Sequence, residues 1–168
     1  MNKNKITQTI CANILRILII GIGNTYRGDD AAGLVIARHL RKQVPDYVSV
    51  LEESGNGIAF MESWKNADTV ILIDAVHSGT KPGTIHRFDA SAHPLPSEFF
   101  CYSTHTFGVA EIIELARVLN QLPSHLIVYG IEGKRFEAGI GISPEVNKAA
   151  QEVVNRLRQD IHSFLKES

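Results

Sequence analysis

The chain has 168 residues, of which 44% are hydrophobic and 21% charged, and its net charge at pH 7 is -1. This length suits one domain with a sizeable core, and the balanced charge argues against a basic face for nucleic acid. The two cysteines, Cys11 and Cys101, lie far apart, so neither a disulfide framework nor a zinc ribbon is predicted. We expect a cytoplasmic protein, because the sequence has no signal peptide pattern and no membrane span.

The first part of the chain is predicted to be a polar lead-in over 1–13, and the rest, 14–168, a single α/β domain. The apolar run Ile17–Ile20 is typical of a strand buried on both faces of a parallel sheet. A helix is expected over 31–43, because its apolar residues recur at helical spacing and Pro45 follows.

A glycine-bearing loop joins this strand to this helix. Glycines 21, 23 and 28 predict tight turns with positive φ angles. Asp29 and Asp30 stand where the helix should begin, and Asp29 suits the N-cap, which leaves Asp30 to be explained. Ligands usually bind beyond the carboxyl end of such a strand.

The loop does not have the chemistry of a nucleotide site. Tyr26 occupies the third glycine position of a dinucleotide fingerprint, and no G-K-S/T sequence follows, as a P-loop would require. The two carboxylates would also repel phosphate from the helix N-terminus. A cation is the better ligand for this position.

The next elements return the chain to the same edge of the sheet. A strand over 48–51 leads to a turn-rich loop, Glu52–Gly57, and a helix is expected over 58–64. A third apolar run, Thr69–Ile73, is predicted to be a strand that ends at Asp74. Because right-handed crossovers make the three strands parallel, Asp74 should lie beside the loop that carries Asp30.

The second half of the chain completes the predicted sheet. Its expected elements are an antiparallel edge strand (84–88), a helix (106–119) with Ser103 or Thr104 as N-cap and His105 at its start, a strand (126–129), a long loop (130–141) and a final helix opened by Ser143, Pro144 and Glu145. The predicted fold is a single-domain three-layer α/β fold. Its mostly parallel, twisted sheet has about five strands, one of them an antiparallel edge strand, with helices on both faces.

The candidate site residues are Asp30, Asp74 and His105, all expected at the carboxyl edge of the sheet. Two carboxylates and one imidazole suit a divalent first-row metal such as nickel or zinc and leave coordination positions open. Each residue also has a structural interpretation, because Asp74 can cap a turn and His105 can bond backbone at a helix start. His77 is a spare ligand that we assign to an exposed loop, and Cys101 is interpreted as a buried thiol.

Four segments, in this order, resemble the hydrogenase maturation endopeptidases: GIGNTYRGDDAAG (21–33), LIDAV (72–76), STHTFG (103–108) and VYGIEG (128–133). The resemblance covers about residues 15 to 160. It implies an endopeptidase that removes the C-terminal extension of a nickel-iron hydrogenase large-subunit precursor after nickel insertion. The metal-contacting positions of the family match Asp30, Asp74 and His105, which are also the best candidates for catalysis.

The resemblance also implies that nickel arrives with the substrate and acts as a recognition element, so the purified site should be empty or hold another divalent cation. The family often has glutamate in place of Asp30, and Asp-Gly-Gly-Thr in place of Glu52–Gly55, so the precursor preference is open. Arg27, Glu132, Lys134 and Arg135 are candidates to grip a peptide. The alternatives are a stand-alone metal-dependent hydrolase and a non-enzymatic metal- or nucleotide-binding module, and a monomer is compatible with the sequence.

Overall fold

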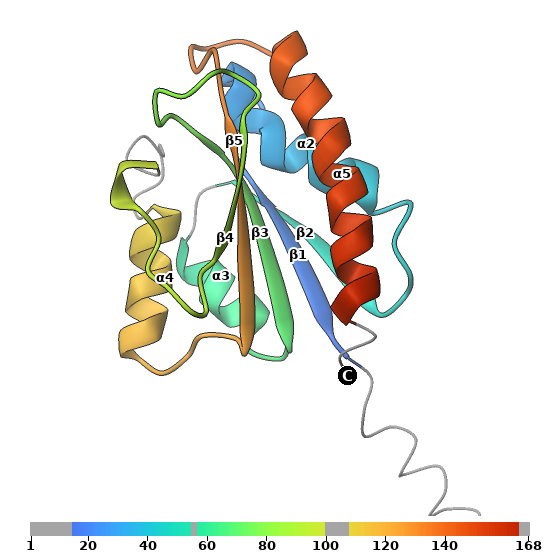
Figure 1. The fold of residues 1–168 in the computed structure, drawn as a ribbon, viewed down its shortest axis with the longest axis vertical. Coiled ribbons are helices and arrows are strands. Elements are labelled where there is room, and N and C mark those ends of the chain that lie inside the picture. The colour runs from blue at the N-terminus through green and yellow to red at the C-terminus, as the bar shows by residue number, and fades with distance from the viewer. Residues whose placement is uncertain (1–14, 55–56, 100–107, 165–168) are drawn as a thin grey trace, which may run out of the picture.

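The fold is a five-stranded sheet with helices on both faces (Figure 1). The structure, a computed structural model, describes residues 15–54, 57–99 and 108–164. The strands are β1 (Ile17–Ile22), β2 (Val48–Glu53), β3 (Thr69–Val76), β4 (Ile85–Asp89) and β5 (His125–Glu132). The helices are η2 (Gly28–Ala31), α2 (Ala32–Leu40), α3 (Gly57–Trp64), η3 (Ser97–Phe99), α4 (Val109–Val118) and α5 (Pro144–Phe164).

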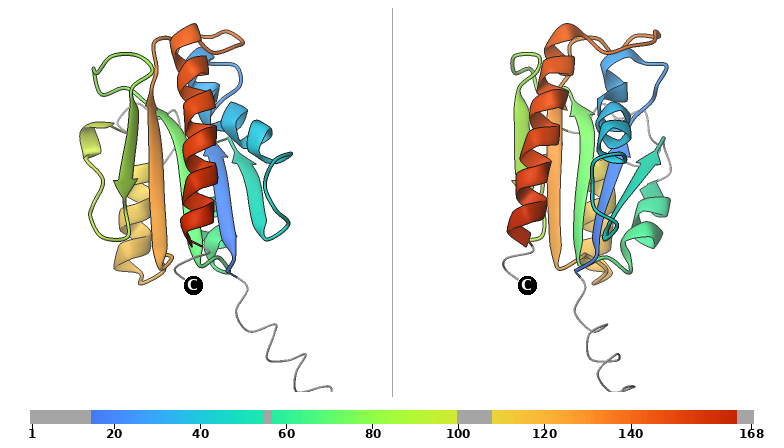
Figure 2. Two further views of the ribbon diagram at one scale, coloured as in Figure 1. Left: turned by 45° about the vertical axis from the view of Figure 1, so that its right-hand side comes forward. Right: turned by 90° about the vertical axis from the view of Figure 1, so that its right-hand side faces the viewer.

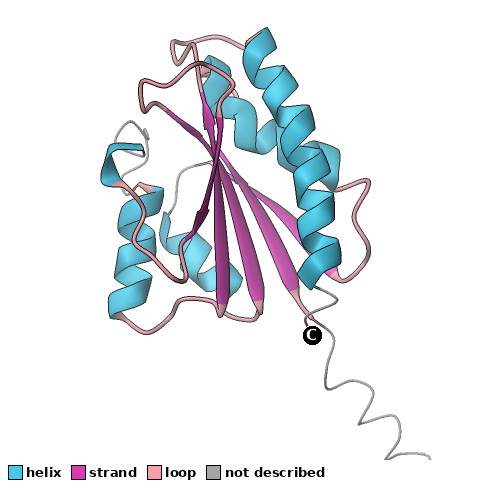
Figure 3. Ribbon diagram, in the orientation of Figure 1, coloured by secondary structure: helices cyan, strands magenta, loops and turns pink. Residues whose placement is uncertain are grey.

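The strand order is β2-β1-β3-β5-β4, and β4 alone pairs antiparallel to its neighbour (Figure 3). This arrangement confirms the predicted fold class, including the antiparallel strand at the edge. Helices α2 and α5 cover one face of the sheet, and α3 and α4 cover the other (Figure 2). Successive strand side chains point to opposite faces, so alternate residues of each strand belong to two separate cores.

The contact between β1 and α2 depends on two glycines. A Cβ atom on Gly21 would lie 2.2 Å from the carbonyl oxygen of Gly33, so a side chain would push the helix off the sheet. The prediction that Gly21 has a positive φ was wrong, because it belongs to β1 and its role is this close approach. Gly23 and Gly28 do have positive φ angles, of 153° and 57°.

Two central strands are longer than the sequence predicted. Strand β3 continues past Asp74 to Val76, and β5 continues to Glu132. The reason is that pairing between the two strands continues, with Asp74 opposite Gly130 and Val76 opposite Glu132. Asp74 therefore lies within a strand and does not end it.

The predicted start of helix α4 is only partly observed. Helix α4 begins at Val109 with Gly108 at its N-cap and no side-chain cap. The predicted caps, Ser103 and Thr104, lie outside the described residues. In the described part of the chain, no helix is long and apolar enough to cross a membrane.

Candidate functional site

Two buried carboxyl groups meet at the carboxyl edge of the central strands. Asp30 belongs to the short helix η2, which follows the loop after β1, and Asp74 belongs to the neighbouring strand β3. Asp30 is 5% exposed and Asp74 is 2% exposed. The negative charge of Asp30 lies close enough to Asp74 to raise the pKa of Asp74.

Among the described residues, no cation acts on the carboxyl group of Asp74 to offset its burial. Burial, and secondly the negative charge of Asp30, raise the pKa of Asp74 well above its usual value. One hydrogen bond, from the backbone N–H of Ala75 to Oδ1 at 2.9 Å, acts in the opposite direction without cancelling the shift. A divalent cation beside the two acids would remove their repulsion and favour the ionised form of both.

Asp74 also faces a defined side of the sheet. It lies on the same face of β3 as Leu72 and Val76, whose side chains belong to the core under α3 and α4. Helix α4 follows His105 in the chain and covers this same face. His105 itself lies outside the described residues, and within those residues no group of three or more His, Cys, Asp or Glu side chains could hold a metal ion.

Asp29 has a different role from the predicted N-cap. Its fully buried carboxylate accepts hydrogen bonds from the backbone N–H groups of Lys134 (2.7 Å) and Arg135 (2.9 Å) and from the N–H and hydroxyl of Ser143. Burial raises the pKa of Asp29, but these hydrogen bonds outweigh burial and hold it below its usual value. Asp29 therefore ties the loop after β5 to the loop after β1.

Two other acids predicted near this edge, Glu132 and Glu52, already have hydrogen-bond or ion-pair partners within the protein. Glu132 is the last residue of β5 and is buried, so the prediction that it lies in a peptide-gripping loop was wrong. Its carboxylate accepts hydrogen bonds from the N–H groups of Ser78 and Gly79 and from the Ser78 hydroxyl. Glu52, which belongs to β2, forms ion pairs with two arginines of the α2 region.

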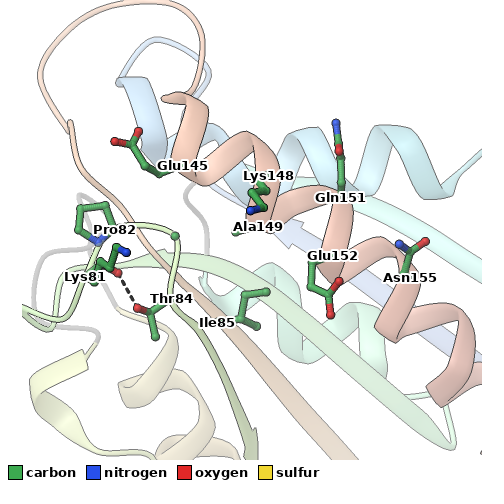
Figure 4. Close-up of a pocket in the computed structure, with 11 residues that line it drawn as sticks. Lys81, Pro82, Thr84, Ile85, Glu145, Lys148, Ala149, Gln151, Glu152 and Asn155 are labelled. Atoms are coloured by element: carbon green, nitrogen blue, oxygen red, sulfur yellow. Dashed lines mark hydrogen bonds between the residues drawn. The ribbon is translucent and has the colours of Figure 1, made fainter.

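Two of the hollows in the described structure differ in how they lie relative to the acid pair. One, of about 430 Å³, is at the carboxyl edge and is lined by Arg27, His77, Lys134, Phe136 and Glu137. The other, of about 680 Å³, lies between the turn before β4 and helix α5 (Figure 4). It belongs to the face opposite Asp74, and its lining mixes both charges, with Lys81 and Lys148 beside Glu145 and Glu152.

The comparisons with known proteins agree with one another. The model of the family "Hydrogenase maturation protease" matches residues 34–160. The chain belongs to the hydrogenase maturation protease family. It is 32% identical over 147 residues to the hydrogenase expression/formation protein HupD of Bradyrhizobium diazoefficiens, which covers 81% of this chain and 77% of that protein.

Two similar proteins come from Escherichia coli. The hydrogenase 2 maturation protease is 29% identical over 153 residues, covering 86% of this chain and 92% of that protein. The solved structure of the hydrogenase maturating endopeptidase HybD has a TM-score of 0.70 at 28% identity, covering 87% of this chain and 94% of that one. This maturation protease is therefore an enzyme with the fold of its relatives, and the family match spans Asp74 and His105 but begins after Asp30.

The role of Asp29 was not predicted from the sequence. Of the cavity lining, Arg27 and Lys134 were predicted as peptide-gripping candidates, but Phe136 and Glu137 were not. The hydrogen bonds of Asp29 join residues more than a hundred positions apart, and no local pattern indicates them. The cavity beside Arg27 depends on the same folding-back of the loop after β5. The only sequence signal for the cavity was the composition of the predicted loop 130–141, which combines four glycines with two cations and an aromatic residue.

Proposed function

We propose that this protease removes the C-terminal extension of a nickel-iron hydrogenase large-subunit precursor after nickel has been inserted. In this proposal nickel enters as part of the substrate. Asp30, Asp74 and His105 complete its coordination, so that only loaded precursor is held with its extension in place for cleavage. Membership of the maturation protease family supports the reaction class, and the resemblance noted in the sequence supports the substrate.

The observation that carries the proposal is the pairing of Asp30 and Asp74. Two buried carboxylates that repel one another are costly to a fold, and a cation between them would convert that repulsion into binding energy. Carboxylate and imidazole donors are suitable ligands for a first-row divalent ion. An incomplete ligand set also suits a metal that arrives and leaves with the substrate, because closed sets retain their metal.

The experiment is a cleavage assay on two forms of one precursor, nickel-loaded and nickel-free, in which the loss of the C-terminal extension is followed by mass spectrometry. The expected result is cleavage of the loaded form alone. Asp30→Asn, Asp74→Asn and His105→Ala should each abolish cleavage of the loaded precursor. His93→Ala is the matched control, because His93 is an exposed histidine between β4 and η3, and this variant should cleave normally.

Three outcomes would contradict the proposal. Equal cleavage of the nickel-free precursor would show that nickel is not the recognition element. Full cleavage by His105→Ala or by Asp74→Asn would show that the substituted residue is not needed at the site. Stoichiometric zinc that survives dialysis against a mild chelator, with hydrolysis of small peptides, would favour a stand-alone metal-dependent hydrolase.

A further inference from the structure

The cavity of about 430 Å³ at the carboxyl edge is a neighbour of the acid pair and contains neither acid. Arg27 lies three residues before Asp30, and His77 lies three residues after Asp74. Because consecutive Cα atoms are 3.8 Å apart, the Cα atom of Arg27 lies within about 11 Å of that of Asp30, and the Cα atom of His77 within about 11 Å of that of Asp74. A peptide held at the acid pair would therefore pass the cavity within a few residues.

The walls of the cavity are fixed by contacts within the protein. The Arg27 side chain donates a hydrogen bond from Nε to the carbonyl oxygen of Phe136 at 3.2 Å. The ring of Phe136 lies edge-on to that of His77, with 5.7 Å between centroids. Gly133 makes room for this ring, since a Cβ atom there would lie 2.3 Å from it. Asp29 holds the backbone of the same loop, so the cavity is formed before any ligand binds.

The charges of the lining point to an anionic ligand. Lys134 is held by Glu145 of α5, with 2.6 Å between Nζ and Oε1. Arg27 is half-buried and forms no ion pair with any described residue. Glu137 is exposed, so water screens its carboxylate more than it screens the guanidinium. The contact with Phe136 uses only Nε of the Arg27 guanidinium, and Arg27 lines the cavity.

We propose that this cavity binds an acidic side chain of the precursor's C-terminal extension through Arg27 and thereby selects which precursor is processed. This inference rests on the proposed function. The planar guanidinium matches a carboxylate with two parallel hydrogen bonds, and the rings of His77 and Phe136 pack against the methylene groups of the same side chain. An extended peptide advances about 3.3 Å per residue, so the acid lies within about four residues of the metal-binding segment of the precursor.

The test measures KM and kcat for cleavage of the nickel-loaded precursor by Arg27→Gln. Glutamine keeps an N–H that can reach the Phe136 carbonyl and removes the positive charge. The expected result is a KM raised about tenfold, with kcat within twofold of wild type, because the interaction holds substrate and transition state equally. Arg158→Gln is the control, since Arg158 is an exposed cation of helix α5 that does not line the cavity, and it should leave KM unchanged.

A second arm identifies the partner group. Each Asp and Glu of the extension is changed in turn to its amide. One such change should raise KM about tenfold with the wild-type protease and less than twofold with Arg27→Gln, because the same contact cannot be lost twice.

Three results would overturn the inference. They are an unchanged KM for Arg27→Gln, an equal rise for Arg27→Gln and Arg158→Gln, and an extension in which no acid is coupled to Arg27. Each of these leaves the proposed function intact as long as wild type cleaves the loaded precursor. Failure of wild type to cleave it at all would instead overturn the proposed function, and the inference with it.

Discussion

Asp29→Asn is expected to destabilise the fold although the substitution changes only one atom of a side chain. The buried carboxylate accepts from three backbone N–H groups, two on Oδ2 and one on Oδ1. Whichever way the new amide is placed, its NH₂ group faces at least one of these donors. The cheaper placement leaves the buried N–H of Ser143 without an acceptor.

The magnitude follows from that one contact. Hydrogen bonds to charged groups contribute about 1.5–3 kcal/mol each, so the free energy of unfolding should fall by about 2 kcal/mol. For a domain of this size the melting temperature should then fall by about 4–8 °C. Because the folded pKa of Asp29 lies below its unfolded value of 3.8, this contribution is present above pH 3.8 and is lost as pH falls through the folded pKa.

The assay is urea unfolding of both proteins between pH 3 and pH 7. Asp68→Asn is the control, because Asp68 also accepts a backbone N–H, at 2.9 Å from Arg16, but is exposed. A surface contact of that kind should contribute less than about 1 kcal/mol. An Asp29→Asn effect no larger than that of Asp68→Asn, or one that does not shrink between pH 4 and pH 3, would refute this account of the loop.

Three further predictions concern the same edge. In metal-free protein Asp74→Asn should raise the melting temperature at pH 7 and not at pH 3.5. The folded pKa of Asp74 is raised, so the wild-type protein loses stability as pH rises above 3.8. The loss is about 1.4 kcal/mol for each pH unit until the folded pKa is reached. A difference in melting temperature between Asp74→Asn and wild type that is the same at pH 7 and at pH 3.5 would contradict this. Gly21→Ala should lower the free energy of unfolding by about 1–3 kcal/mol through overpacking against Gly33, as measured by urea unfolding, and an unchanged midpoint would count against the close approach. Glu132→Gln should speed hydrogen exchange at the Ser78 and Gly79 amides through local opening, without unfolding of the whole domain. Unchanged exchange rates at these amides would show that the Glu132 carboxylate does not hold the segment after β3.

The predictable part of the fold came from patterns that act locally. Unbroken apolar runs such as Ile17–Ile20 and Thr69–Ile73 are expected in strands buried on both faces, and the structure has β1 and β3 there. The right-handed crossover rule then places the ends of both strands at one edge. That is why Asp30 and Asp74 could be expected to meet although they lie far apart in the sequence.

The roles that could not be predicted depend on contacts between distant segments. Asp29 fits the pattern of an N-cap, but the donors that reach it come from the loop after β5. Glu132 lies in a segment whose glycines are typical of a loop, whereas continued pairing with β3 keeps it in the sheet. Both predictions failed because hydrogen-bond partners more than 50 positions away decide these roles.

The central claim is that nickel carried by the precursor is recognised by Asp30, Asp74 and His105. Its most direct test is the ratio of the dissociation constants for nickel-free and nickel-loaded precursor, measured by calorimetry with wild type and with His105→Ala. We predict that wild type binds the loaded form at least about tenfold more tightly and that the ratio falls to about one in His105→Ala, while both proteins melt at similar temperatures. A ratio that is the same in both proteins would contradict the claim.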